Sequence, residues 1–157
     1  MMALKIIVTF GAMLLASSVA AAASGSGPWQ HHIGNDPMTD VLRASAGTMG
    51  EQGAMAFFQC EKGGDAVFLV KVQYIDIAMD PVRDVVWRVD SGKPRHQTWV
   101  NLDDGAAING AEAIAMAKQV AAATERLVVR SGGKTIVFSV RGSTAAINTA
   151  LTTCGIR

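Results

Sequence analysis

The sequence lacks an excess of charge of either sign, with 14 basic and 13 acidic side chains in 157 residues. It also lacks a block of lysines and arginines, the electrostatic feature that attracts nucleic acid and anionic membrane surfaces. We therefore expect no nucleic-acid partner. Apolar residues make up 50% of the chain. They are spread along it, a composition that excludes an intrinsically disordered protein.

Long apolar runs are missing as well. The N-terminal run, Ile6–Leu15, is shorter than the roughly 20 residues that a membrane-spanning helix needs. A lysine precedes it and small residues follow it, an order typical of a secretory signal peptide. We expect residues 1–23 to be cleaved off near Ala23 and residues 24–157 to form a single domain. The product would be periplasmic or secreted, without an integral membrane segment.

Cysteine is scarce, since only Cys60 and Cys154 occur. In an oxidising compartment, an even pair far apart in the sequence favours a disulfide over two buried free thiols. A bridge that closes so long a loop would stabilise the fold by about 4 to 5 kcal/mol if loop entropy dominates. Neither cysteine has a histidine close to it in the sequence, so a nucleophilic role is not supported. We expect the Cys60–Cys154 disulfide.

The apolar pattern predicts an α+β fold with a mainly antiparallel sheet. A strand is expected near 29–33, followed by three hairpins with turns rich in glycine. A capping-box pattern at Asn109 and Glu112 predicts a helix before the third hairpin. A second helix should close the chain and direct Cys154 into the core. The expected hairpins span residues 54–74, 85–100 and 125–141, and the expected helices span 111–123 and 143–154.

Residues 36–49 fit two structures. Asp36 before Pro37 could cap a short helix, since proline suits the first helical position. The same residues could instead form a turn that leads into a strand through Val41, Arg43 and Ser45. We expect the strand.

The nearest thing to a metal-binding cluster in the sequence is His31 and His32 followed by Asp36 and Asp40. Adjacent histidines on a strand point to opposite faces of the sheet, so both cannot bind one ion from regular β structure. Zinc would need three or four converging ligands. We expect no metal site and no cofactor.

A catalytic triad can be assembled on paper from Asp90, Ser91 and His96. Asp90 and Ser91 are neighbours in a turn, and no G-x-S-x-G elbow surrounds the serine. The glycine pairs elsewhere are hairpin turns rather than phosphate-binding loops. We therefore expect no catalytic residues and a protein that is not an enzyme.

The hairpin 85–100 carries the densest group of polar side chains, and its register decides which of them share a face. If Asp90 lies opposite Pro94, both tryptophans of the hairpin fall on one face. If Asp90 lies opposite Arg95, the tryptophans are separated. A shift of one residue exchanges the two faces, so the burial of apolar side chains should determine the register. We expect the first register, with a polar face that could contact a partner, made of Arg88, Asp90, His96 and Thr98.

Four motifs in this order resemble a known family: NDPMTDV at 35–41, FFQC at 57–60, VVWRVDSGKPRHQTW at 85–99 and LTTCG at 151–155. They are similar to motifs of the small exported accessory proteins associated with type VI secretion, of the VasI/TagO type. Gln59, Trp87 and Ile156 depart from that pattern. A more distant resemblance is to the invasion-associated IalB-type proteins, which usually have more cysteines.

The resemblance implies a non-catalytic, periplasmic accessory module that binds a protein of the cell envelope. It brings no catalytic residues with it. The alternative function is inhibition of a cell-wall hydrolase of the lysozyme or amidase type, with the loop Asp90–Pro94 inserted into the cleft of the enzyme.

Overall fold

The computed structural model describes residues 27–72 and 81–157. The expected signal peptide, its cleavage near Ala23 and the end of the first expected hairpin lie outside these residues. The N-terminal half forms β1 (Gln30–Asn35), β2 (Leu42–Met49), the 3-10 turn η1 (Glu51–Gly53), β3 (Met55–Glu61), β4 (Ala66–Lys71) and β5 (Val82–Val89). The remaining elements are β6 (Arg95–Leu102), β7 (Gly105–Asn109), α1 (Gly110–Ala122), β8 (Arg126–Ser131), β9 (Lys134–Ser139) and α2 (Ser143–Thr153).

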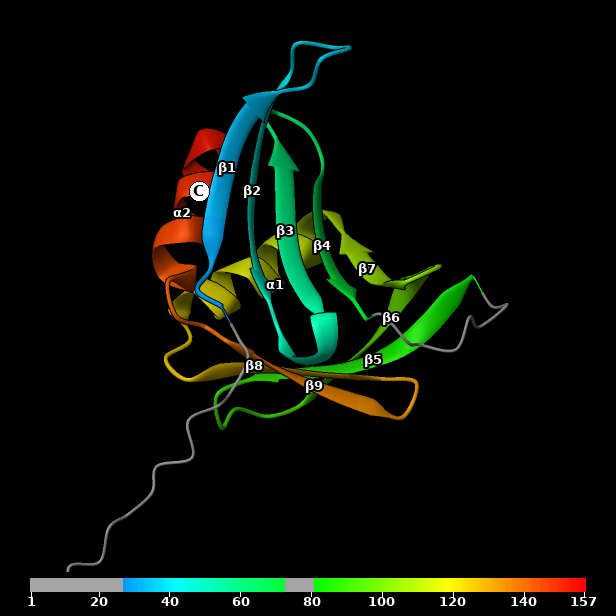
Figure 1. Ribbon diagram of the computed structural model, residues 1–157. Coiled ribbons are helices and arrows are strands. Elements are labelled where there is room, and N and C mark those ends of the chain that lie inside the picture. The colour runs from blue at the N-terminus through cyan, green and yellow to red at the C-terminus, as the bar shows by residue number, and fades with distance from the viewer. Residues whose placement is uncertain (1–26, 73–80) are drawn as a thin grey trace, which may run out of the picture.

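The described strands form one nine-stranded sheet in the order β1-β2-β3-β4-β7-β6-β5-β8-β9 (Figure 1). Every pair of neighbouring strands is antiparallel, which confirms the expected α+β class with a mainly antiparallel sheet. The three expected hairpins form as β3–β4, β5–β6 and β8–β9. Strands β1 with β2, β2 with β3, and β6 with β7 form three more.

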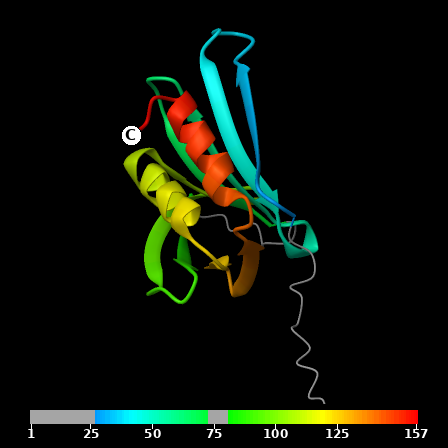
Figure 2. The same ribbon diagram turned by 90° about the vertical axis from the view of Figure 1, so that its left-hand side faces the viewer.

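Both helices pack on the same face of the sheet, α1 against β4 and β7, and α2 against β1, β2 and β3 (Figure 2). The buried side chains of α1 are Ala113, Met116, Ala117, Val120 and Ala121. Because most of them are small, the helix axis can lie close to the strands. Strands β2, β3 and β4 alternate buried and partly exposed residues, so the sheet has an inner face toward the helices and an outer face away from them.

The Cys60–Cys154 disulfide is present and joins β3 to the C-terminal end of α2. Both cysteines are buried. Residues 36–49 form a turn followed by β2, as expected. The helix α1 begins close to the expected position, but the side chain of Asn109 makes no capping hydrogen bond, so the expected capping box is absent.

Trp29 connects the start of the sheet to its last strand. Its backbone N–H donates to the carbonyl of Arg141 over 2.9 Å, and its indole N–H donates to the carbonyl of Ser139 over 2.8 Å. The sheet is therefore curved enough for residues at its two ends to meet. Within residues 27–72 and 81–157, neither helix has the length and apolar character to cross a membrane.

Candidate functional site

The β5–β6 hairpin has the expected faces but a different register. The structure pairs Trp87 with Arg95, which places Pro94 at the level of Arg88 rather than opposite Asp90. The register is therefore shifted by two residues from the expected one. Because side chains alternate with a period of two, such a shift leaves every side chain on its expected face. Trp87 and Trp99 both lie on the inner face, where they are buried.

Gln97 joins the two tryptophans of the hairpin. Its side-chain oxygen accepts the indole N–H of Trp87 over 2.6 Å and that of Trp99 over 3.3 Å. The guanidinium carbon of Arg95 lies 5.6 Å from the centre of the Trp87 ring, a cation–π arrangement. The inner face of the hairpin is thus a fixed cluster of two indoles, an amide and a cation.

Asp90 does not lie on the expected polar face with Arg88, His96 and Thr98. Its backbone has φ of 50°, a left-handed conformation that aspartate tolerates. Its carboxylate accepts the backbone N–H groups of Thr124, Glu125 and Arg126 over 3.0, 2.7 and 3.0 Å. These hydrogen bonds tie the hairpin to the connection between α1 and β8. They also lower the pKa of Asp90 to about 2, the bond from Thr124 contributing most.

We expect Asp90→Asn to lower the melting temperature at neutral pH. Asparagine tolerates the same backbone conformation, so the change removes the charge without adding strain. The folded pKa lies below the ordinary value of 3.8, so the stabilisation is complete above about pH 4 and is lost as the pH falls through about 2. Melting curves from pH 7 to pH 2 should show the variant and the original protein converge. A constant difference would contradict a role for the charge.

The other residues of the expected contact face, Arg88, His96 and Thr98, do lie together on the outer face. His96 pairs with Val86 of β5, and Thr98 pairs with Asp84. Both His96 and Thr98 are exposed, while Arg88 is partly buried.

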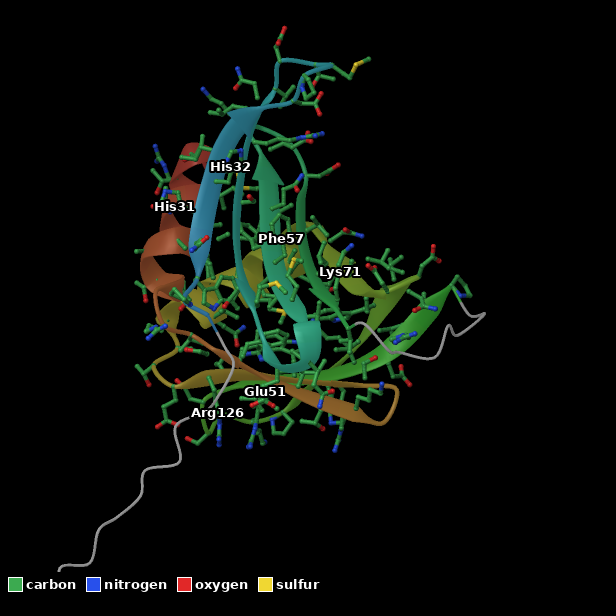
Figure 3. All side chains as sticks on the ribbon, viewed as in Figure 1. His31, His32, Glu51, Phe57, Lys71 and Arg126 are labelled. Carbon is green, nitrogen blue, oxygen red and sulfur yellow. A yellow bond between two sulfur atoms is a disulfide. The ribbon has the colours of Figure 1, made fainter. Side chains whose placement is uncertain are left out.

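An apolar row on the outer face was missed in the sequence. Cross-strand pairs align one residue from each of six neighbouring strands: Gly47, Phe57, Leu69, Ala107, Val100 and Val82, which we call the outer row. Figure 3 looks onto this face, with Phe57 on β3. Val82 and Val100 are 49% and 45% exposed, Phe57 and Leu69 are partly buried, and Ala107 is buried. No described helix covers the row, since α1 and α2 pack on the inner face.

A pocket of about 360 Å³ opens at one end of the outer row. Its walls include Pro28, Met49, Met55 and Phe57, with His32 at β1. A Cβ on Gly47 would come within 2.9 Å of the Phe57 ring, so the absence of a side chain there leaves room for that ring. Methionines adapt to irregular shapes, which suits a surface that accepts an apolar side chain.

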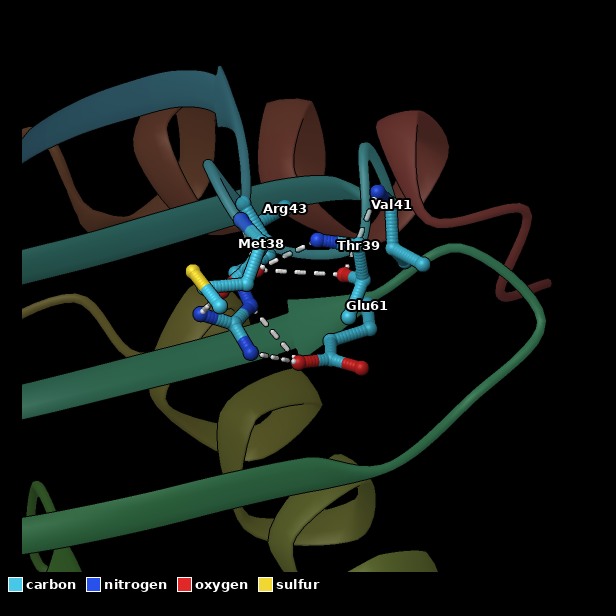
Figure 4. Close-up of polar contacts among 6 residues, drawn as sticks. Met38, Thr39, Val41, Arg43 and Glu61 are labelled. Carbon is cyan, nitrogen blue, oxygen red and sulfur yellow. Dashed lines mark hydrogen bonds and ion pairs between the residues drawn. The ribbon is translucent and has the colours of Figure 1, made fainter.

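The NDPMTD motif forms a rigid turn (Figure 4). The carboxylate of Asp36 accepts the backbone N–H of Met38 over 2.9 Å and that of Thr39 over 3.0 Å, and these bonds, led by that from Met38, lower its pKa. Arg43 forms ion pairs with Asp36 and Glu61. The interactions are local and mostly surface-exposed, so they account for the turn without a ligand.

His31 and His32 point to opposite faces, because they pair with Ala46 on the inner side and Ser45 on the outer side. In the described part of the chain, no group of three or more histidine, cysteine or acidic side chains converges as metal ligands would.

The fold and these surfaces define a class: a disulfide-bonded α+β domain with helices packed on one sheet face and, on the other, an apolar row beside polar side chains that no described helix covers. Comparison of the chain with protein-family models, with curated proteins and with solved structures finds no match.

Proposed function

We propose that this chain is a non-catalytic binding module of the periplasm, an accessory protein that holds a protein partner of the cell envelope on the outer face of its sheet. The observation that carries the proposal is the outer row, which runs across six strands without a described element covering it. A row of aligned, partly exposed apolar residues differs from the single exposed apolar residues that are common on monomers.

The occupant we propose is a protein segment that presents apolar side chains. The pocket beside Phe57 has the volume and the apolar wall to take one aromatic or long aliphatic side chain. The polar residues Arg88, His96 and Thr98 lie on the same face and would form the rim. A membrane is a weaker candidate because the chain has nearly equal numbers of basic and acidic residues. The disulfide supports an oxidising compartment.

The association with type VI secretion rests on the motifs that resemble the VasI/TagO type. Three of these motifs have clear structural roles here, since the Asp36 turn orders the β1–β2 connection and Cys60 and Cys154 form the bridge. We propose that the partner belongs to such a secretion assembly.

Photo-crosslinking in the expressing bacterium tests the proposal. A benzoylphenylalanine at position 57 or 100 should give an adduct of defined mass with one envelope protein. The matched control is position 33, because Ile33 is equally apolar and 43% exposed but pairs with Ala44 on the inner side of β1. Val100→Lys should abolish the adduct at position 57, whereas Ile33→Lys should leave it intact.

Equal yields of the adduct at positions 33 and 100 would contradict the proposal. So would the absence of any protein adduct together with flotation of the protein with phosphatidylglycerol vesicles. Identification of the adduct by mass spectrometry separates the secretion assembly from other envelope partners.

A second candidate function, inhibition of a cell-wall hydrolase, is favoured by the loop Ser91–Pro94. Its residues are exposed, and Asp90 and the bond from the Gly92 N–H to the Val89 carbonyl hold it in one shape. Loops that are rigid before binding lose little entropy on entering a cleft. Lysozyme or amidase should lose activity when the protein is added and should keep it when the Lys93→Glu variant is added instead. That result would support inhibition rather than accessory binding.

A further inference from the structure

A second pocket lies on the inner side of the β5–β6 hairpin, away from the outer row. It has a volume of about 390 Å³, within the range of small-molecule sites. Its walls come from the end of β5, the loop, the start of β6 and α1, through Trp87, Arg88, Val89, Gly92, Lys93, Pro94, Arg95 and Gln119.

The wall of this pocket is positively charged. Three of its eight residues, Arg88, Lys93 and Arg95, carry a positive charge, and none carries a negative one. The ion pairs of the described chain, residues 27–72 and 81–157, involve none of these three cations. The nearest acidic residue in the sequence, Asp90, has its carboxylate occupied by the backbone N–H groups of residues 124–126.

The pocket is also ordered before any ligand arrives. Arg95 lies over the Trp87 ring, and Gln97 fixes that ring through its indole N–H. Asp90 anchors the loop to the segment after α1, which brings the loop and Gln119 to the same cavity. Preorganised donors bind without a large loss of side-chain entropy.

We propose that this pocket binds a small organic oxyanion, a carboxylate or a phosphate, held by Arg95 and Lys93 and assisted by the amide of Gln119. A guanidinium offers paired N–H donors that match the oxygens of either group. The proposed ligands Arg95, Lys93 and Gln119 are not part of the proposed protein-contact surface, of which only Arg88 also lines this pocket.

Titration of the purified protein with inorganic phosphate and, separately, with succinate tests the site at constant ionic strength. Saturable shifts of the Trp87 indole and Arg95 Nε signals in ¹H–¹⁵N spectra are expected, and the tighter of the two ligands identifies the preferred anion. Arg95→Gln should raise the dissociation constant about tenfold, the loss expected for a charged hydrogen bond.

Lys93→Gln serves as a second variant, because its exposed loop position does not contribute to the core. It should also weaken binding. Lys62→Gln is the matched control, since Lys62 is an exposed lysine in the turn of the β3–β4 hairpin, and it should leave the dissociation constant unchanged. The proposal is overturned if neither anion gives a saturable shift, or if Lys93→Gln and Lys62→Gln behave alike.

Discussion

Replacing both cysteines by alanine should lower the free energy of unfolding by about 4 to 5 kcal/mol. The bridge joins residues 94 apart in the sequence, so it removes much of the freedom of the unfolded chain. It also fastens α2, the last element, to a central strand on the side of the sheet where the core lies. Without it, the C-terminal helix is held by packing and by the hydrogen bonds of Ser143 and Thr144 to the carbonyls of Val120 and Ala121.

Urea denaturation of the double variant Cys60→Ala/Cys154→Ala, followed by circular dichroism, measures this loss. In the presence of a reductant, the urea midpoint of the original protein should approach that of the variant, because reduction removes the same constraint. Without a reductant, the intact mass should be two hydrogens below that of the free-thiol form. If the double variant is as stable as the oxidised protein, the bridge does not stabilise the fold by restricting the conformational freedom of the unfolded chain.

Much of the fold could be predicted because the relevant signals are local. The alternation in β3 and the spacing of Ile147, Ala150, Leu151 and Cys154 each fix one buried face from neighbouring residues alone. The strand β7 was missed because its sequence, GAAIN, begins with three small residues and runs directly into α1. Its assignment depends on pairing with β4, a contact that no local pattern reveals.

The candidate sites also combine features that local patterns predict with features that depend on contacts between distant residues. The faces of the β5–β6 hairpin followed from the period of two, whereas its pairing was wrong by two residues. Asp90 accepts hydrogen bonds from residues 124–126, and no local pattern indicates that distant partner. The outer row could not be predicted either, because it contains one residue from each of six strands and no local pattern connects them. Only the strand order and the register align Phe57 with Val100 and Val82.

Two adjacent phenylalanines provide the sharpest test of the two sheet faces. Phe58 is fully buried among the inner core residues, so Phe58→Ala should cost about 3 to 5 kcal/mol of unfolding free energy. Phe57 is only partly buried on the outer face, so Phe57→Ala should cost clearly less. The two variants change the same side chain at neighbouring positions of β3, and urea denaturation compares them directly.

The same pair separates stability from binding. Phe57→Ala should remain folded at room temperature and yet lose the crosslink formed through position 100, because its ring forms part of the pocket wall. Phe58→Ala should retain that crosslink wherever it is still folded, since its ring lies on the inner face. An equal loss of stability in both variants would contradict the open outer face. An undiminished crosslink in Phe57→Ala would place the partner elsewhere on the molecule, because a partner seated on the outer row contacts that ring.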